Sequence, residues 1–152
     1  MIYKEASAGY EDAPITILQG HCDMVAEKTP DSDHDFTKDG LNISVKDGYI
    51  TANGTTLGGD DGIAVAYGLA LLDSTDIPHP PLEVLFTVDE EIGLLGAVGL
   101  DCSVLKGRRF INLDSEAEGS LWISCAGGLS GISYPCPARR RTKEKRYEVK
   151  SL

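Results

Sequence analysis

The stretch LEVLFTVDEE at residues 82–91 decides the fold class of this chain. Residues 82–87 are rich in leucine, β-branched and aromatic side chains and follow a proline-rich break, which is typical of a strand. Three carboxylates, Asp89, Glu90 and Glu91, come directly after this strand. Because ligands bind beyond the carboxyl ends of parallel strands, the stretch predicts an α/β fold with a polar site at one end of its sheet.

Helices and strands alternate on both sides of this stretch. Residues 62–72 are rich in Ala, Leu and Val and almost uncharged, which predicts a buried helix. Asp60 and Asp61 stand just before it, where an N-cap belongs. Further strands are predicted at residues 15–18, 110–113 and 121–124. This alternation predicts an α/β architecture with a largely parallel, mixed sheet flanked by helices.

Shorter elements complete the expected architecture. Residues 43–52 predict a hairpin around Asp47-Gly48, a favoured two-residue turn. Residues 92–100, which are apolar and rich in glycine, predict a second helix. The last residues, 145–152, alternate like a strand that the end of the chain interrupts, so we expect a domain boundary nearby.

Composition and charge narrow the possible classes of function. Hydrophobic residues make up 41% and charged residues 25% of the 152 residues, which is typical of a globular domain. The net charge is −10, and seven of the 14 basic residues lie in the last 14 positions. A body this acidic repels phosphate backbones, so we expect no nucleic-acid partner. No apolar run is long enough to span a bilayer and no leader opens the chain, so we expect no membrane partner and a cytoplasmic location.

The four cysteines have no metal-binding or disulfide spacing. They stand at positions 22, 102, 125 and 136 without a C-x-x-C pair. We therefore expect four reduced thiols.

Acidic and histidine side chains follow three of the predicted strands. His21 follows the first, Glu90 and Glu91 follow the second, and Asp114 follows the third, while Asp60 stands at the predicted helix start. Each residue alone has a simpler explanation as a helix cap, a helix-dipole acid or a solvated turn. Because strand ends share one edge of a parallel sheet, we expect them to converge there as ligands of a divalent cation. An EF-hand at 31–42 is excluded, because its required Gly and Glu are Phe36 and Asn42.

Four motifs, in order along the chain, carry a family resemblance. They are HCD at 21–23, LGGDDG at 57–62, TVDEEIG at 87–93 and NLDSE at 112–116. Together they resemble the di-zinc exopeptidases, the metallopeptidase clan of carboxypeptidase G, aminoacylase and the carnosinases. Residues 18–28, 34–36 and 124–128 are most similar to the dipeptidases of this clan that cleave Xaa-His dipeptides. The resemblance implies a three-layer zinc-exopeptidase fold that acts on a small peptide substrate.

The resemblance also implies a set of metal ligands. His21 and Asp114 would bind one ion, Glu91 would bind a second ion, and Asp60 would bridge the two. The implied cofactor is therefore two divalent metal ions, with zinc expected first and Mn or Co as alternatives that suit the same His and carboxylate donors.

Two further residues receive catalytic roles from the resemblance. Asp23 would not bind the metal itself but would fix the tautomer of the His21 imidazole. Glu90 would be the general base, which takes a proton from the attacking water and passes it to the leaving amine.

Parts of the implied enzyme are not found in this chain. The family's second-metal histidine and oxyanion-stabilising histidine belong downstream, so we expect an incomplete metal-binding core at residues 1–137. Residues 138–152 would begin a lid or dimerisation domain through which two copies pair. A non-catalytic metal-binding fragment, or an aminoacylase or tripeptidase of the same clan, remain the alternatives.

Overall fold

The computed structural model describes residues 1–115, 117, 119–124, 132–135 and 147–150. The chain divides into two compact units, Met1–Glu116 and Ala117–Leu152. The first unit contains all the predicted site residues. The boundary predicted between residues 137 and 138 lies outside the described residues.

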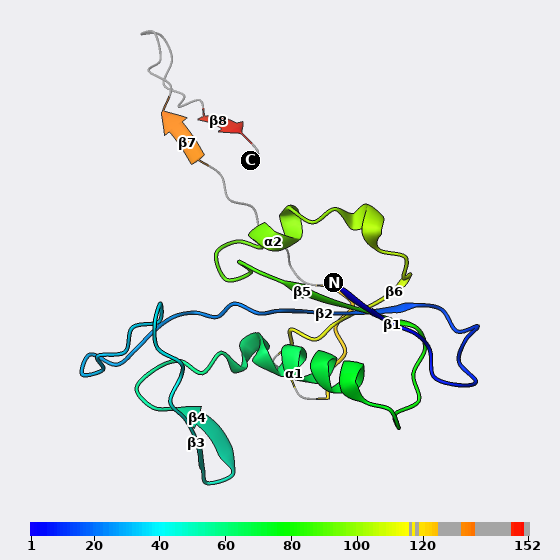
Figure 1. The fold of residues 1–152 in the computed structure, drawn as a ribbon. Coiled ribbons are helices and arrows are strands. Elements are labelled where there is room, and N and C mark those ends of the chain that lie inside the picture. Colours follow the sequence, from blue (N-terminus) through cyan, green and yellow to red (C-terminus); the bar gives the residue numbers. More distant parts are fainter. Residues whose placement is uncertain (116, 118, 125–131, 136–146, 151–152) are drawn as a thin grey trace, which may run out of the picture. The chain divides into compact units, whose positions relative to one another are not determined.

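A four-stranded sheet with the order β1-β5-β2-β6 forms the centre of the first unit (Figure 1). Its strands are β1 (Ile2–Lys4), β5 (Leu82–Thr87), β2 (Thr16–His21) and β6 (Arg109–Asn112). β2 runs parallel to β5 and β6, whereas β1 pairs antiparallel with β5. The predicted, largely parallel sheet is therefore confirmed, and β1 is an edge strand that we did not predict.

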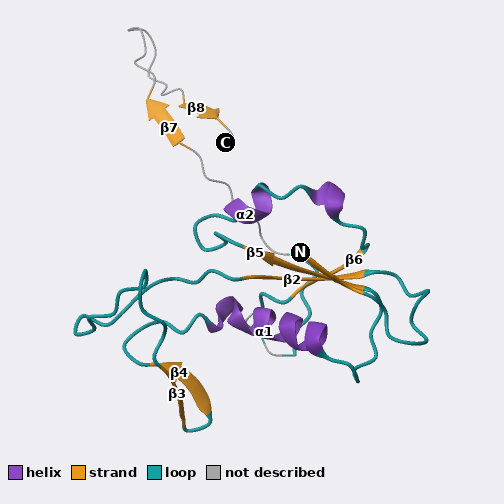
Figure 2. Cartoon of the chain, in the orientation of Figure 1, coloured by secondary structure: helices purple, strands orange, loops and turns teal. Residues whose placement is uncertain are grey.

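Helices lie on both faces of this sheet, which gives the expected three layers (Figure 2). The helix α1 (Gly59–Asp73) covers one face, and α2 (Leu95–Val98) with the short 3-10 helix η1 (Cys102–Val104) covers the other. The long helix predicted at 92–100 is wrong in extent. Gly93 and Leu94 both have positive φ angles, 115° and 60°, which do not fit a continuous right-handed helix.

The core lies between α1 and the two central strands. Leu18, Leu82 and Val84 form a buried cluster, each with at most 8% of its surface exposed. Burying each of these side chains contributes roughly 1.5–3 kcal/mol. Gly68 allows the close approach of α1, because a Cβ atom there would lie 2.9 Å from Cγ1 of Val84.

The prediction that α1 is a buried helix is wrong for one of its faces. Only Asp61, Ala64 and Gly68 are buried, whereas Ile63 and Tyr67 are 53% and 58% exposed. The sheet covers one side of the helix, and the small residues on that side determine which face is buried. The first turn of α1 includes Asp60 and Asp61, with Gly58 as its N-cap. Because these two residues have non-helical dihedral angles, the regular part of the helix starts at Gly62, as predicted.

The remaining elements are small two-stranded sheets. The predicted hairpin is confirmed as β3 (Ile43–Lys46) and β4 (Tyr49–Ala52), with positive φ angles of 52° and 83° at Asp47 and Gly48. The predicted final strand is confirmed as β8 (Tyr147–Lys150), which pairs antiparallel with β7 (Ile132–Pro135).

The strand predicted at 121–124 is wrong. These residues are not in a strand, and Leu121 and Ile123 are 99% and 101% exposed. A strand forms only with a hydrogen-bonding neighbour, and in the described parts of the chain no strand pairs with this segment. None of the helices in the described ranges has the length and apolar character that a bilayer crossing requires.

Candidate metal centre

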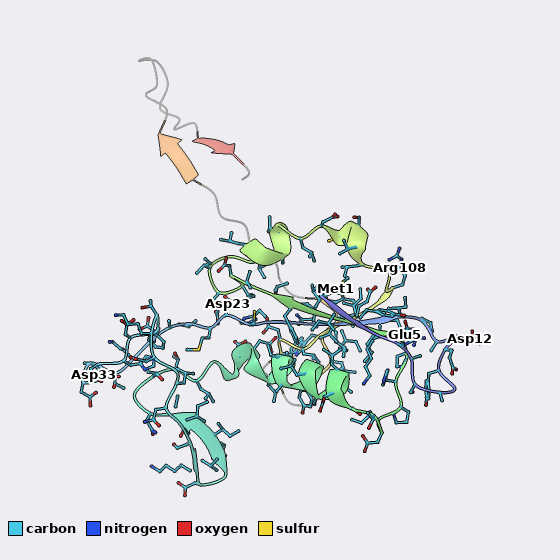
Figure 3. The ribbon with its side chains drawn as sticks, in the orientation of Figure 1. Met1, Glu5, Asp12, Asp23, Asp33 and Arg108 are labelled. Atoms are coloured by element: carbon cyan, nitrogen blue, oxygen red, sulfur yellow. The ribbon has the colours of Figure 1, made fainter. Side chains whose placement is uncertain are left out.

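The candidate site lies where three parallel strands end and one helix begins. His21 is the last residue of β2 and pairs in register with Thr87, the last residue of β5. Glu90 follows β5, Asp114 follows β6, and Asp60 lies in the first turn of α1. Figure 3 shows Asp23, just beyond β2, at the end of the sheet opposite Arg108, which precedes β6. The strand directions thus produce the convergence that the sequence predicted.

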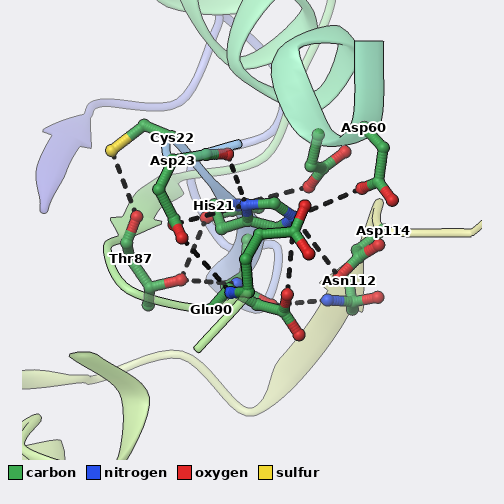
Figure 4. A network of polar contacts seen from close by, with 12 residues as sticks. His21, Cys22, Asp23, Asp60, Thr87, Glu90, Asn112 and Asp114 are labelled. Carbon is green, nitrogen blue, oxygen red and sulfur yellow. Dashed lines mark hydrogen bonds and ion pairs between the residues drawn. The ribbon is translucent and has the colours of Figure 1, made fainter. Parts of the chain in front are cut away.

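The His21 imidazole is the centre of this cluster (Figure 4). Its side chain is only 1% exposed, and Nε2 lies 3.2 Å from Oδ1 of Asp60, 3.8 Å from Oε2 of Glu90 and 3.9 Å from Oδ2 of Asp114. One N–H group can donate a good hydrogen bond to only one of these oxygens. Three carboxylates around one ring nitrogen therefore favour a shared cation.

Two overlapping groups of donor atoms have the spacing of a metal site. His21, Asp60 and Asp114 form one group, and His21, Glu90 and Glu91 form the other, with ligand atoms within 4.8 Å of one another in each. Tetrahedral zinc ligands at about 2.05 Å from the ion lie roughly 3.4 Å apart. The donor set of imidazole and carboxylates therefore fits divalent zinc, manganese or cobalt.

Asp23 lies behind the imidazole. Nδ1 of His21 is 2.9 Å from the Asp23 carbonyl oxygen and 3.4 Å from its carboxylate Oδ1. Burial raises the pKa of the Asp23 carboxyl, but the backbone N–H groups of Glu90 and Glu91 outweigh this effect and lower it. The carboxylate thus stays charged beside Nδ1, and this position suits the predicted role of orienting His21.

The pKa values of His21 and Glu90 are both raised, for different reasons. Burial lowers the pKa of the His21 imidazole, but the carboxylates of Asp60, Asp114 and Glu90 outweigh it and raise the pKa above 6.5. Burial raises the pKa of the Glu90 carboxyl, His21 opposes this effect, and the charges of Asp114 and Glu91 add to it. The His21 shift reflects the negative charge around the imidazole, which a cation would neutralise, whereas the Glu90 shift comes mainly from burial.

A small cavity of about 160 Å³ opens between α1 and the segment after β6. Its lining includes Asp60, Asp61, Leu113 and Asp114. The cavity places two of the predicted ligands next to space for water and a small reactant.

We missed the role of Gly20 and Asp61 in building the site. The buried Asp61 carboxylate accepts a hydrogen bond from the backbone N–H of His21 at 3.2 Å. A Cβ atom at Gly20 would lie 2.5 Å from Oδ2 of Asp61 and 2.4 Å from Cβ of Ala64. Burial raises the pKa of the Asp61 carboxyl, and the His21 N–H partly opposes this effect. A glycine directly before the predicted ligand was the available sequence indication.

The structure brings all six predicted site residues together. The assignment of Glu91 as ligand and Glu90 as base stays a prediction, because both belong to the same donor group around His21. Cys22 and Cys102 are free thiols, as expected, and the other two cysteines lie outside the described residues.

Comparisons with known proteins give a consistent family. Residues 17–119 match peptidase family M20/M25/M40. The cytosol non-specific dipeptidase of Escherichia coli is 46% identical over 133 residues, which are 88% of this chain and 27% of that protein.

Solved structures agree with this match. An aminoacylhistidine dipeptidase from Vibrio alginolyticus superposes with a TM-score of 0.82 at 46% identity, over 88% of this chain and 27% of that one. The aminopeptidase PepT of Bacillus cereus has a TM-score of 0.57 at 30% identity, over 76% of this chain and 29% of that one. This chain therefore spans about a quarter of the length of the relatives it matches.

Proposed function

Because the chain belongs to peptidase family M20/M25/M40, we propose that it carries the metal-binding core of a dipeptidase that hydrolyses Xaa-His dipeptides. The observation that carries the proposal is the buried His21 Nε2, which faces carboxylates from three separate elements within 3.9 Å. The E. coli relative is named a cytosol non-specific dipeptidase and the Vibrio relative an aminoacylhistidine dipeptidase. These names support a dipeptide substrate and a cytoplasmic location.

We assign two zinc ions to this core. His21 and Asp114 would hold one ion, Glu91 would hold the other, and Asp60 would contribute to both. The two donor groups support a cation at His21, and Asp60 lies beside both Nε2 and the cavity, while the sharing of Asp60 between two ions rests on the family resemblance. When bound, such ions polarise the scissile carbonyl and lower the pKa of water toward neutrality.

Glu90 has the properties of the proton acceptor. Its carboxyl is partly buried, and burial with the neighbouring acids raises its pKa, which brings the group closer to the working pH of a general base. Asp23 holds Nδ1 of His21, so that Nε2 stays available as a ligand. A positioned base of this kind typically contributes about 10²–10⁴-fold to a rate.

The assignment to Xaa-His dipeptides rests on the family resemblance of residues 18–28 and 124–128, and residues 125–128 lie outside the described residues. We also assign pairing of two copies to the lid domain that the resemblance implies after residue 137. A tripeptidase from Staphylococcus aureus, with a TM-score of 0.57 at 28% identity over 76% of this chain and 29% of that one, makes a tripeptide the next substrate to test.

Metal analysis and substrate comparison test the proposal. After chelation and dialysis against zinc, the wild-type chain should retain more than one ion per chain, or one ion if the second site needs the downstream histidine. His21→Ala should retain none at that site. A full-length relative that carries the same residues should hydrolyse β-alanyl-histidine in preference to a tripeptide or an N-acetyl amino acid, and the 152-residue chain should do so far more slowly, because it lacks the oxyanion-stabilising histidine that the resemblance implies. No zinc in the wild-type chain would overturn the metal assignment, and preferred cleavage of a tripeptide or an acyl amino acid would overturn the dipeptide assignment.

A further inference from the structure

Three polar side chains form a continuous row across the three strands that end at the metal centre. Nδ2 of Asn112 on β6 donates to Oε1 of Gln19 on β2 at 2.6 Å, and Nε2 of Gln19 donates to Oγ1 of Thr87 on β5 at 3.2 Å. The Thr87 hydroxyl in turn donates to the carbonyl of Gly20 at 3.4 Å. We name this row of Asn112, Gln19 and Thr87 the cross-strand relay.

The relay lies just before the predicted site residues on β2, β5 and β6. Gln19 precedes His21 by two residues, Asn112 precedes Asp114 by two, and Thr87 precedes Glu90 by three. Gln19 pairs in register with Asn112, and its carbonyl accepts the N–H of Leu113 at 2.9 Å. The same residue therefore aligns β2 with β6 through both its backbone and its side chain.

We propose that Gln19 is a positioning residue, which sets the relative heights of the three strand ends and thereby the spacing of His21, Glu90 and Asp114. This inference rests on the proposed metal function. The physical reason is that His21 ends β2 whereas Asp114 follows β6, so a small slip of β6 against β2 would move Asp114 away from Nε2 of His21. Groups that hydrogen-bond a metal ligand directly change metal affinity about 10- to 100-fold when they are removed, and Gln19 acts one contact further out, so the lower end of this range is expected.

Three variants of the relay and one control variant separate a loss of strand alignment at the site from a general loss of stability. Gln19→Met keeps the length of the side chain and removes both relay hydrogen bonds. Thr87→Val removes the hydroxyl, whereas Thr87→Ser keeps it. Thr51→Val is the control, because it removes a side-chain hydrogen bond to Ser44 in the β3–β4 hairpin, outside the sheet of the site.

The first measurement uses the metal-free chain and follows amide hydrogen exchange at Leu113 by NMR. Gln19→Met and Thr87→Val should exchange about fivefold faster than wild type, as expected for the loss of one typical hydrogen bond from a local opening. Thr87→Ser and Thr51→Val should exchange like wild type. This measurement tests alignment without any metal.

The second measurement titrates the same variants with Co²⁺ and records its visible absorption. Gln19→Met and Thr87→Val should bind cobalt about 10-fold more weakly, with an altered spectrum, whereas Thr87→Ser and Thr51→Val should match wild type. Unchanged cobalt binding in Gln19→Met would overturn the inference, and so would equal effects of Thr87→Ser and Thr87→Val. A wild-type chain that binds no cobalt contradicts the proposed function instead, and the exchange at Leu113 then decides the alignment inference alone.

Discussion

Nε2 of His21 lies 3.2 Å from Oδ1 of Asp60, although 39 residues separate them along the chain. The contact exists because β2 ends where α1 begins, so that a strand end and a helix start meet at one edge of the sheet. Asp114 and Glu90 approach the same nitrogen from the ends of β6 and β5. Four segments therefore build one candidate cation site.

Replacement by alanine should have different effects at Glu90 and at Glu91. In a full-length relative that carries these residues, Glu91→Ala should lose zinc, because it removes a ligand, whereas Glu90→Ala should keep zinc and lose about 10²–10⁴-fold in dipeptide turnover. Zinc content after dialysis and the rate with β-alanyl-histidine measure both effects. If the two variants matched in zinc content and in rate, the assigned division of roles would be wrong.

The stability of the metal-free chain should depend on the charge of His21. Its folded-state pKa is raised above 6.5, so this group stabilises the fold below 6.5 and loses that contribution as the pH rises through the raised pKa. The affinity for zinc should show the opposite trend. Zinc binding needs the neutral imidazole, so it weakens as the pH falls through the same pKa.

Urea unfolding and zinc titration across this range measure these two trends. His21→Gln is the control, because it removes the titrating group. A metal-free wild-type chain whose pH profile equals that of His21→Gln would contradict the expected coupling.

Glu83 should be important for the stability of the sheet. Its carboxylate is 1% exposed and accepts backbone N–H bonds from Lys106 and Gly107 at 3.0–3.1 Å, just before β6 begins. Glu83→Gln replaces an acceptor oxygen by a donor and should lower the free energy of unfolding by about 1–3 kcal/mol.

The exposed Asp12 provides the comparison, since Asp12→Asn should change the free energy of unfolding by no more than about 0.5 kcal/mol (Figure 3). Equal urea midpoints for the two variants would show that the buried carboxylate does not anchor this turn.

Two glycines of the same region should differ in their tolerance of alanine. Gly20→Ala places a methyl group within 2.4–2.5 Å of Ala64 and Asp61 and should cost about 1–3 kcal/mol. Gly62→Ala meets no atom within 4 Å and, inside α1, should stabilise the fold by up to about 1 kcal/mol. Thermal unfolding of both variants measures the difference, and a destabilised Gly62→Ala together with a neutral Gly20→Ala would contradict the packing described here.

The sequence predicted the parts of the molecule that depend on local pattern. β5 was predicted at its observed limits, and the strand ends were correctly expected to bring His21, Asp60, Glu90 and Asp114 together. These predictions are correct because a parallel arrangement is sufficient to place the ends of the strands at one edge of the sheet.

Features that depend on contacts between distant segments could not be predicted in the same way. The roles of Gly20 and Asp61 arise only when α1 packs onto β2, and the alignment by Gln19 needs three strands in register. Residues 121–124 have a strand-like composition, but composition alone does not supply a pairing neighbour.

The most direct test of the central claim is X-ray absorption at the zinc edge of the dialysed chain. The account predicts nitrogen and oxygen neighbours at about 2.0–2.2 Å, with the outer scattering of one imidazole and no sulfur. His21→Ala should remove the imidazole contribution. Zinc–sulfur scattering at about 2.3 Å would instead identify a cysteine such as Cys22 as the ligand and would contradict the site of His21 and carboxylates.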